Sequence, residues 1–578
     1  MNDLQFVLPP QLHAAVRASL ERCDADRVLP RIWEGDASVW TGADEPRWLG
    51  WLHIVEDQLA RVSEYERLAD DVRSEGFTRV VLLGMGGSSL APEVLSRTFG
   101  RQPGAPSLAI LDSTHPAQIR RVVGNDLRTT LFVVASKSGS TLEPSILNRY
   151  CFERTREVVG DGVGRHFMAI TDPGSQLEQT ARRDQFRQIV SGVPSIGGRF
   201  SALSAFGMTP AALAGIDVAE LLRCAAIMVG RCGPDQPVSE NPGAVLGIIL
   251  GEAARIGRDK PTVIASPGIE ALGAWLEQLL AESTGKNGKA LIPIDGEFPA
   301  PPGYYGDDRC FVQLRLLTTP DREQDRVVDA FERDGHPVIR IDVADRYELG
   351  AEFFRWEMAT AVAGVTLGVN PFDQPDVEAA KEITRRLAAE YAAKGSLPTE
   401  EPLFRSDEIA LFTDPRNAEE LERLQTGDAG QADLTSWLRA HFARVVPGDY
   451  VALLAYLPMT ASIESRLQQI RHRIRDTTRN ATSVGFGPRY LHSTGQAYKG
   501  GPNTGVFLEI TAEEAHDLPV PGEPYTFGVI HAAQARGDFQ ALIDRGRRAL
   551  RVHLSRNLDA GLAAFDRAVA EALRKTQH

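Results

Sequence analysis

Glycine and hydroxyl residues follow an apolar run at residues 80–94 (VVLLGMGGSSLAPEV), where the pattern changes from a buried strand to a helix. Glycine lets a backbone approach a ligand closely, and the free amides at a helix start favour an anion. Packing alone can also explain a glycine-rich turn. The stretch suits a phosphate group through the glycines Gly84, Gly86 and Gly87 and the hydroxyls of Ser88 and Ser89.

A second stretch of the same kind, residues 133–144 (VVASKSGSTLEP), carries hydroxyls, one lysine and a glycine where a strand ends and a helix begins. Short donors and a single positive charge match the needs of a phosphate monoester. A simple helix N-cap is the structural alternative. The stretch lacks the GxxxxGK[ST] pattern, which disfavours a nucleoside triphosphate. The candidate ligands are Ser136, Lys137, Ser138 and Thr141.

Strands and helices alternate from residue 77 onward, after an amphipathic segment that we expect to be helical. Near-continuous apolar strands separated by helices indicate a parallel sheet covered on both faces. In such sheets ligands bind beyond the carboxyl ends of the strands. Both hydroxyl-rich stretches occupy that position, so we expect them to form one site.

Length and charge restrict the remaining possibilities. A chain of 578 residues is too long to fold around one hydrophobic core, so we expect two to four domains. Its net charge of −14 disfavours nucleic acid or an anionic membrane as a partner. Five scattered cysteines without CxxC spacing predict neither a disulfide framework nor a zinc site. We find no signal-like or membrane-spanning run and expect a cytoplasmic protein.

Five motifs in the same order resemble the glucose-6-phosphate isomerase family, which is built from sugar-isomerase (SIS) domains. They are GMGGSS, SKSGSTLE, and residues 197–217, 281–289 and 370–381. The chain is most similar to the isomerase half of transaldolase–isomerase fusions, although the first 76 residues are too few for a transaldolase barrel. The resemblance implies an α/β fold of doubly wound parallel sheets of SIS (flavodoxin-like) type. It also implies interconversion of glucose 6-phosphate and fructose 6-phosphate through an enediol(ate), without metal or organic cofactor.

The resemblance assigns roles to individual residues. Glu282 matches the catalytic base that moves a proton between adjacent carbons, and Arg199 matches the arginine beside the enediolate. Arginine keeps its proton and can stabilise an anion without competing for the transferred hydrogen. Lys381 matches the lysine that assists ring opening and stabilises charge. Further substrate contacts are expected from Gly198, Gln278 and Gln374.

The family also uses a ring-opening histidine shortly after the catalytic glutamate, but this chain has Arg309 there. A close match to the histidine motif, RYLHSTGQ, contains His492 near the C-terminus. The surrounding region repeats the order of strands and helices that begins near Lys260, which implies a partial C-terminal repeat of the second SIS domain. In the family the histidine comes from the partner subunit of a homodimer. We hypothesise that the repeat replaces that subunit and delivers His492; the alternative is that His492 only caps or packs within its own domain.

These patterns divide the chain into five predicted parts. They are a helical segment (1–76), a first SIS domain with the phosphate loops (77–245), a second with the catalytic Glu and Lys (246–395), a linker (396–446) and the SIS-like repeat (447–578). Two alternatives remain open: the same chemistry on a mannose phosphate or sulfonated hexose, and a non-catalytic sugar-phosphate sensor. The sequence is compatible with a monomer or a homodimer.

Overall fold

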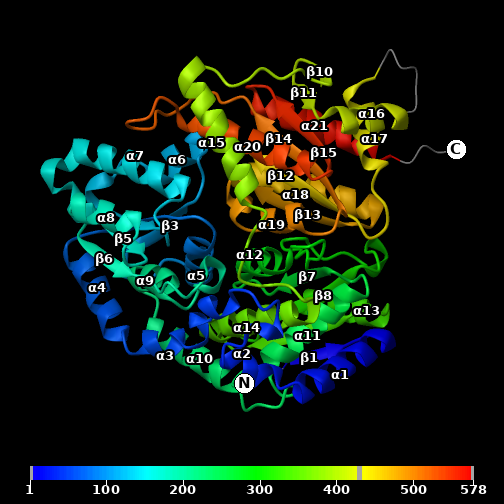
Figure 1. Cartoon of the computed structure of the whole chain (residues 1–578). Helices are drawn as coiled ribbons and strands as arrows, with labels where there is room; N and C mark the ends of the chain where they lie inside the picture. The colour runs from blue at the N-terminus through cyan, green and yellow to red at the C-terminus, as the bar shows by residue number, and fades with distance from the viewer. Residues whose placement is uncertain (1–3, 426–431, 575–578) are drawn as a thin grey trace.

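The computed structural model describes residues 4–425 and 432–574 and contains three separate sheets flanked by helices (Figure 1). The first sheet is parallel throughout, with strand order β3-β2-β4-β5-β6. Every residue of β4 and β5 is buried, as continuous apolar runs predict for strands covered on both faces. The strands are β2 (Arg79–Leu83), β3 (Ser107–Leu111), β4 (Thr130–Ala135), β5 (Phe167–Thr171) and β6 (Gln188–Ser191).

Helices cover both faces of this first sheet. One core lies against α6, α7 and α8, and the other lies against α4 and α9. The helices are α4 (Val62–Ser74), α5 (Leu90–Phe99), α6 (Pro116–Val123), α7 (Leu142–Val159), α8 (Gln176–Arg183) and α9 (Ala205–Leu213). The doubly wound arrangement predicted from the alternating pattern is therefore present.

The second sheet has the order β1-β9-β8-β7 and contains one strand that the sequence pattern did not reveal. The expected helical segment begins with β1 (Leu4–Val7), which pairs antiparallel with β9 (Val338–Val343). The parallel strands beside it are β8 (Arg309–Leu316) and β7 (Lys260–Ala265). The helices are α1 (Pro10–Ala25), α2 (Val28–Trp33), α3 (Ile54–Leu59), α10 (Val218–Arg231), α11 (Pro242–Arg255), α12 (Leu272–Thr284), α13 (Arg322–Arg333) and α14 (Leu349–Leu367).

The third sheet is built by the C-terminal residues in the order β10-β11-β15-β14-β12-β13. Part of the segment predicted as a linker folds into it, since β11 pairs antiparallel with β15. The strands are β10 (Phe404–Arg405), β11 (Ile409–Phe412), β12 (Tyr450–Tyr456), β13 (Ala481–Phe486), β14 (Gly505–Ala512) and β15 (Arg548–Leu554). The helices are α16 (Pro415–Leu424), α17 (Leu434–Phe442), α18 (Ala461–Thr478), α19 (Gly495–Gly500), α20 (Phe527–Asp544) and α21 (Leu558–Ala572).

The second and third sheets share one topology. Strands β7, β8 and β9 lie side by side in parallel, as do β12, β14 and β15. An antiparallel strand flanks the last strand in each sheet, β1 in one and β11 in the other. On the opposite edge, the parallel bridge between Thr262 and Ile294 corresponds to the pairing of β12 with β13. This agreement supports an internal repeat whose copies diverge after that edge strand.

We call each sheet, together with the helices that cover it, a unit, and one helix links the second unit to the third. Helix α15 (Glu378–Lys394) follows the second sheet in the chain but packs along α20 of the third unit (Figure 1). The contact is close, because a Cβ added at Gly537 would lie 3.0 Å from the backbone oxygen of Ala380. The five domain boundaries remain predictions.

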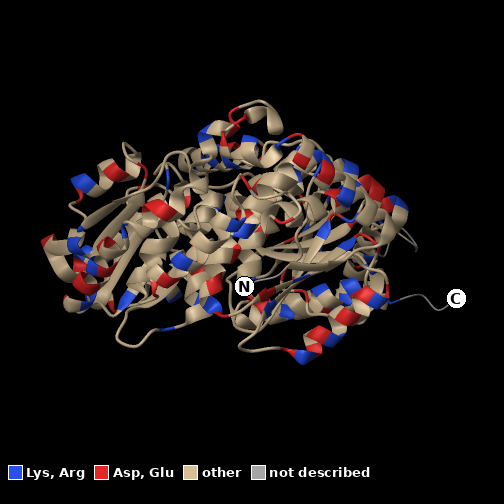
Figure 2. Ribbon diagram, turned by 90° about the horizontal axis from the view of Figure 1, so that it is seen from below, with Lys and Arg blue, Asp and Glu red and all other residues tan. Residues whose placement is uncertain are grey.

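Charged residues of both signs alternate along the outer helices (Figure 2). This mixture agrees with a sequence in which 63 Lys and Arg residues accompany 77 Asp and Glu residues. Among residues 4–425 and 432–574, no helix has the length and apolar character needed to cross a membrane.

Candidate active site

One pocket of about 200 Å³ collects all the residues that the sequence nominated. It lies at the carboxyl ends of β2 and β4, where the first sheet meets α12, α15 and the turn that precedes α19. This is the position at which doubly wound sheets bind ligands. The nominated residues that line it are Gly86, Gly87, Ser88, Ser136, Lys137, Ser138, Thr141, Gly198, Arg199, Gln278, Glu282, Gln374, Lys381 and His492.

Two glycines in the first turn allow three parts of the chain to meet. Gly86 has a φ of +54°, and a Cβ there would lie 2.8 Å from both the Gln278 amide nitrogen and the His492 carbonyl oxygen. A Cβ on Gly87 would lie 1.9 Å from the carbonyl oxygen of Gly198. Side chains at these positions would force the pocket walls apart. The glycines are therefore required for packing, and the same turn also lines the candidate ligand pocket.

The second turn presents its hydroxyls at the start of an 18-residue helix, α7. Thr141 occupies the N-cap position, but its side chain makes no capping hydrogen bond. Ser138 and Ser140 are exposed, with their hydroxyl oxygens 2.7 Å apart, while Ser136 accepts a 3.1 Å bond from the Gly139 amide. The loop thus offers donors at the positive end of a helix dipole, which suits a phosphate.

Lys137 differs from the other residues of this loop. Its ammonium forms an ion pair with Asp172 and donates to the Pro194 carbonyl oxygen at 2.9 Å. Its charge is therefore partly compensated within the protein. A phosphate at this loop would depend more on hydroxyl and amide donors than the sequence motif implies.

Glu282 and Arg199 face each other across the pocket. Glu282 lies in the last turn of α12, and its Oε1 is 3.6 Å from Nη1 of Arg199. Its other oxygen accepts a 3.1 Å bond from the amide of Gln278, one turn earlier. Arg199 is almost fully buried and also donates to Ser283 at 2.7 Å and to Gln374 at 2.9 Å. These hydrogen bonds hold the Glu282 carboxylate and the Arg199 guanidinium beside each other in the same pocket.

The loop that carries Gln374 is held from two sides. Arg199 donates to the carbonyl oxygens of Pro371 at 2.6 Å and Asp373 at 2.9 Å. Lys286 donates to the Asn370 carbonyl at 2.6 Å and pairs with the Asp373 carboxylate at 2.5 Å. Burial, with Arg199 close by, lowers the pKa of Lys286 to about 8. Lys286 lies within the 281–289 motif, but sequence reasoning did not identify its role.

Lys381 lies in the first turn of α15, and its ammonium is 2.7 Å from Glu378. Its side chain is 40% exposed. Exposed ion pairs of this kind contribute little stability, so the lysine can leave Glu378 for a substrate at small cost.

His492 reaches the pocket from the C-terminal repeat of the same chain. Its carbonyl oxygen accepts a 2.7 Å bond from Gln278. Arg489, three residues earlier, is bound by Glu93 at 2.6 Å and Asp112 at 2.7 Å, both in the first unit. The turn that presents His492 is therefore anchored on both neighbouring units.

Glu143 determines which nitrogen of His492 carries a proton. Its Oε1 lies 3.1 Å from His492 Nε2. Burial alone would raise the pKa of this carboxyl, but His492, a backbone hydrogen bond and Lys381 together lower it. An ionised carboxylate only accepts, so Nε2 holds the hydrogen and Nδ1 is left for proton transfer. Sequence reasoning missed Glu143, which ends the SKSGSTLE motif.

The comparisons agree with these motifs. The family model described as phosphoglucose isomerase matches residues 56–295. Residues 56–295 belong to the phosphoglucose isomerase family. The glucose-6-phosphate isomerase of Rubrobacter xylanophilus is 29% identical over 64% of this chain and 94% of its own length. That of a Synechococcus strain is 35% identical over 45% of this chain and 53% of its own length.

A solved structure extends the agreement to the fold. A hypothetical protein from Thermus thermophilus aligns with a TM-score of 0.57 at 24% identity, over 66% of this chain and 99% of its own. About a third of the chain lies outside this alignment. At this identity the likeness concerns the fold alone.

The arginine that stands in place of the expected histidine is structural. Arg309 is fully buried and forms a 3.0 Å ion pair with Glu297. Glu297 also accepts a 2.7 Å bond from Thr482 of the third unit. Arg309 thus helps to join the two repeats and does not line the pocket.

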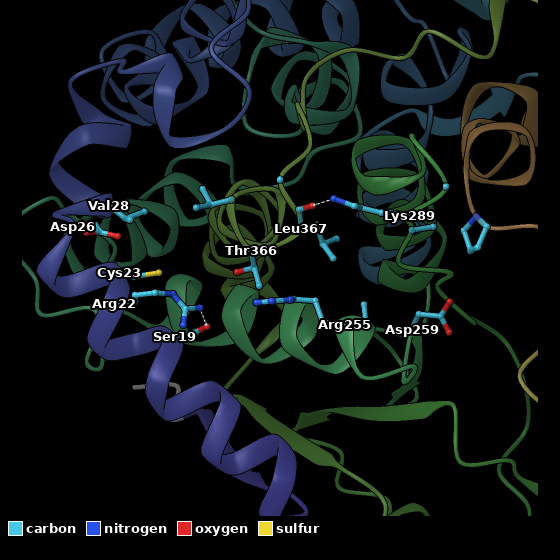
Figure 3. Close-up of a pocket in the computed structure, with 16 residues that line it drawn as sticks. Ser19, Arg22, Cys23, Asp26, Val28, Arg255, Asp259, Lys289, Thr366 and Leu367 are labelled. Carbon is cyan, nitrogen blue, oxygen red and sulfur yellow. Dashed lines mark hydrogen bonds between the residues drawn. The ribbon is translucent and has the colours of Figure 1, made fainter.

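A larger cavity of about 710 Å³ lies between α1, α11 and the end of α14 (Figure 3). Its cations already have partners. Arg22 and Arg255 share Glu252, at 3.5 and 3.1 Å, and Lys289 donates to the Leu367 carbonyl oxygen at 2.5 Å. The last two groups lie where α11 and α14 end, a position at which cations offset the helix dipole. We assign no chemistry to this cavity.

Proposed function

We propose that this protein catalyses the aldose–ketose isomerisation of glucose 6-phosphate and fructose 6-phosphate through an enediol(ate) intermediate. The observation that carries the proposal is the meeting of Glu282, Arg199 and His492 at one pocket, beside a hydroxyl-rich helix N-terminus. The relatives named glucose-6-phosphate isomerase support the same choice of substrate.

Binding would place the substrate phosphate at the start of α7. Ser136, Ser138 and Thr141 offer hydroxyl groups there, and Gly86 and Gly87 line the same pocket. Helix amides and hydroxyls hold a phosphate without a cluster of cations. This arrangement is compatible with a strongly acidic protein.

Ring opening moves one proton from the anomeric hydroxyl to the ring oxygen while the bond between C1 and that oxygen breaks. His492 would serve through Nδ1, because Nε2 donates to Glu143. Lys381, which lines the same pocket, would assist this step. Imidazole suits this step because it gains and loses a proton near neutral pH.

Isomerisation then requires one base. Glu282 would remove the proton on C2 of the open aldose, which leaves an enediolate with its charge on O1. The proton on the C2 hydroxyl then passes to O1, and protonated Glu282 returns its proton to C1 as the C2–oxygen bond becomes the carbonyl of the ketose. Arg199 would stabilise the negative oxygen and keep its own protons. Gln278 holds the Glu282 carboxylate in place.

A substrate panel tests the function. The wild-type protein is assayed with glucose, fructose and mannose 6-phosphates, pentose 5-phosphates and a 6-sulfonated hexose, with product detected by a coupled dehydrogenase. We expect turnover to be highest for the glucose and fructose 6-phosphates. Preference for mannose 6-phosphate or the sulfonate would favour a different sugar substrate, and binding without turnover would favour a sensor.

We also propose that the protein acts in the cytoplasm and needs no partner subunit for its histidine. All five cysteines are unpaired thiols, which persist in reducing compartments. His492 of the C-terminal repeat lines the same pocket as Glu282 of the same chain. A monomer would then be fully active.

A further inference from the structure

Gln534 connects the C-terminal repeat to the pair formed by Glu143 and His492. It lies on α20 and is 3% exposed. Its Nε2 donates to Glu143 Oε1 at 2.7 Å, the same oxygen that lies 3.1 Å from His492 Nε2. Its Oε1 accepts a 2.6 Å bond from the hydroxyl of Thr114, which is fully buried. The four side chains form one continuous line of hydrogen bonds.

Donor and acceptor roles along this line are fixed by chemistry. The Glu143 carboxylate only accepts, so the amide of Gln534 must turn its NH₂ group toward it. The amide oxygen then faces Thr114, whose hydroxyl must donate. No member of the line can reverse without placing two acceptors against each other. The network therefore holds Glu143 in a single orientation.

Gln534 also helps to keep Glu143 ionised. A hydrogen bond to the charged form lowers the pKa of a carboxyl, whereas burial raises it. Glu143 is buried on α7, so the loss of a charge-assisted bond would favour its protonated form. A protonated Glu143 could donate to His492 and reverse the tautomer that leaves Nδ1 free.

We propose that Gln534, supported by Thr114, is a positioning residue for ring opening. It acts through Glu143 to keep the proton of His492 on Nε2. The inference rests on the proposed isomerase function and extends it to a residue on α20 and one in the loop after β3. The C-terminal repeat then supplies both the ring-opening histidine and part of the network that orients it.

The test separates ring opening from proton transfer. Turnover of cyclic glucose 6-phosphate is compared with deuterium uptake at C2 of a tetrose 4-phosphate, which cannot close a ring because its terminal hydroxyl is phosphorylated. The variants are Gln534→Leu and Thr114→Val. The matched control is Gln540→Leu on the same helix, where the amide bonds Asp544. Loss of the hydrogen-bond partner behind a metal-binding histidine costs about 10- to 100-fold in activity, and we expect the same range for the partner behind His492.

We expect Gln534→Leu to lower kcat on the cyclic sugar about 10- to 100-fold with little change in KM, and to leave deuterium uptake near the wild-type rate. Thr114→Val should show the same pattern more weakly, and the double variant should be no worse than Gln534→Leu. Gln540→Leu should match the wild type in both reactions.

A charged replacement gives a readout that packing alone would not move. In Gln534→Glu, two carboxyls face each other and one of their pKa values rises. At low pH the shared proton lets the new carboxyl of the Gln534→Glu variant donate as the amide does, so activity on the cyclic sugar is retained. As pH rises and that proton leaves, repulsion disrupts the pair. The ratio of variant to wild-type kcat should therefore fall with increasing pH.

The outcomes distinguish the two proposals. A wild type that isomerises no hexose phosphate overturns the proposed function. A wild type that isomerises, together with a Gln534→Leu variant that keeps wild-type kcat or loses both reactions equally, overturns the positioning role alone. If Gln534→Leu does not fold, the Thr114→Val ratio and the Gln534→Glu pH profile decide in the same way.

Discussion

The imidazole of His492 lies 3.1 Å from the carboxylate of Glu143, although 349 residues separate them along the chain. Glu143 belongs to the first unit and His492 to the C-terminal repeat. The backbone of His492 is held in turn by Gln278 of the second unit. The pocket therefore depends on all three units of one chain.

An intrachain site predicts that two inactive variants cannot rescue each other. We expect a mixture of Glu282→Gln and His492→Ala proteins, unfolded together and refolded, to stay at the activity of the separate variants. Each chain would lack one group of its own site. In a dimer that exchanges histidines, the mixed species would contain one intact site and activity would return. A coupled isomerase assay over a range of mixing ratios measures this.

The first sheet was predictable because its strands are continuous apolar runs followed by glycine or hydroxyl turns, and β2 and β4 show this pattern clearly. The strands β1 and β11 were not, because each is four residues long and is stabilised by pairing with a strand far along the chain. Local pattern carries no information on such partners.

The candidate site divides in the same way. Residues inside compact motifs, such as Glu282 and Arg199, could be nominated from the sequence. The Asp172 partner of Lys137 and the Gln534 partner of Glu143 could not, because these contacts join segments separated by 35 and 391 residues. His492 could be predicted from its motif, but its orientation depends on Glu143 and Gln534, which are distant in the sequence.

Removal of the proposed base should separate binding from chemistry. Loss of a general base costs about two to four orders of magnitude in rate. We expect Glu282→Gln to lose that much kcat while it still binds a sugar phosphate, measured by calorimetry. Glu270→Gln, outside the pocket on an exposed turn, is the control. Equal activity of Glu282→Gln and wild type would contradict the mechanism.

His492→Ala should affect the two substrate forms differently. Without the imidazole, turnover of cyclic glucose 6-phosphate should fall by about two orders of magnitude or more, because general acid–base catalysis of ring opening is lost. Deuterium uptake by an acyclic tetrose phosphate should change little, since Glu282 and Arg199 remain. His516→Ala, which alters an exposed histidine, is the control. Unchanged turnover of the cyclic sugar would refute the role of His492.

Lys286 predicts a pH dependence of stability. Its pKa is lowered to about 8 in the folded protein, from 10.5. Between these values the unfolded chain binds more protons than the folded one, so this group makes the free energy of unfolding rise with pH. Below pH 8 both states are protonated and the contribution is constant. Urea denaturation of wild type and Lys286→Met at several pH values from 7 to about 10 measures the difference. We expect the wild type to gain stability relative to the variant across this range, and a difference that is constant or falls would contradict the assignment.

Gly87→Ala should damage the pocket through sterics alone. The new Cβ would lie 1.9 Å from the Gly198 carbonyl oxygen, a backbone atom that cannot rotate away. Overpacking of this kind costs about 1–3 kcal/mol, and the shift would displace Arg199, which follows Gly198. We expect a lower Tm together with a large loss of activity. Gly162→Ala is the matched control, because its Cβ would meet no atom within 4 Å. Thermal denaturation and the isomerase assay compare the two variants. A Gly87→Ala protein that is as stable and as active as Gly162→Ala would contradict the prediction, because the turn could then move away from the Gly198 loop without harm.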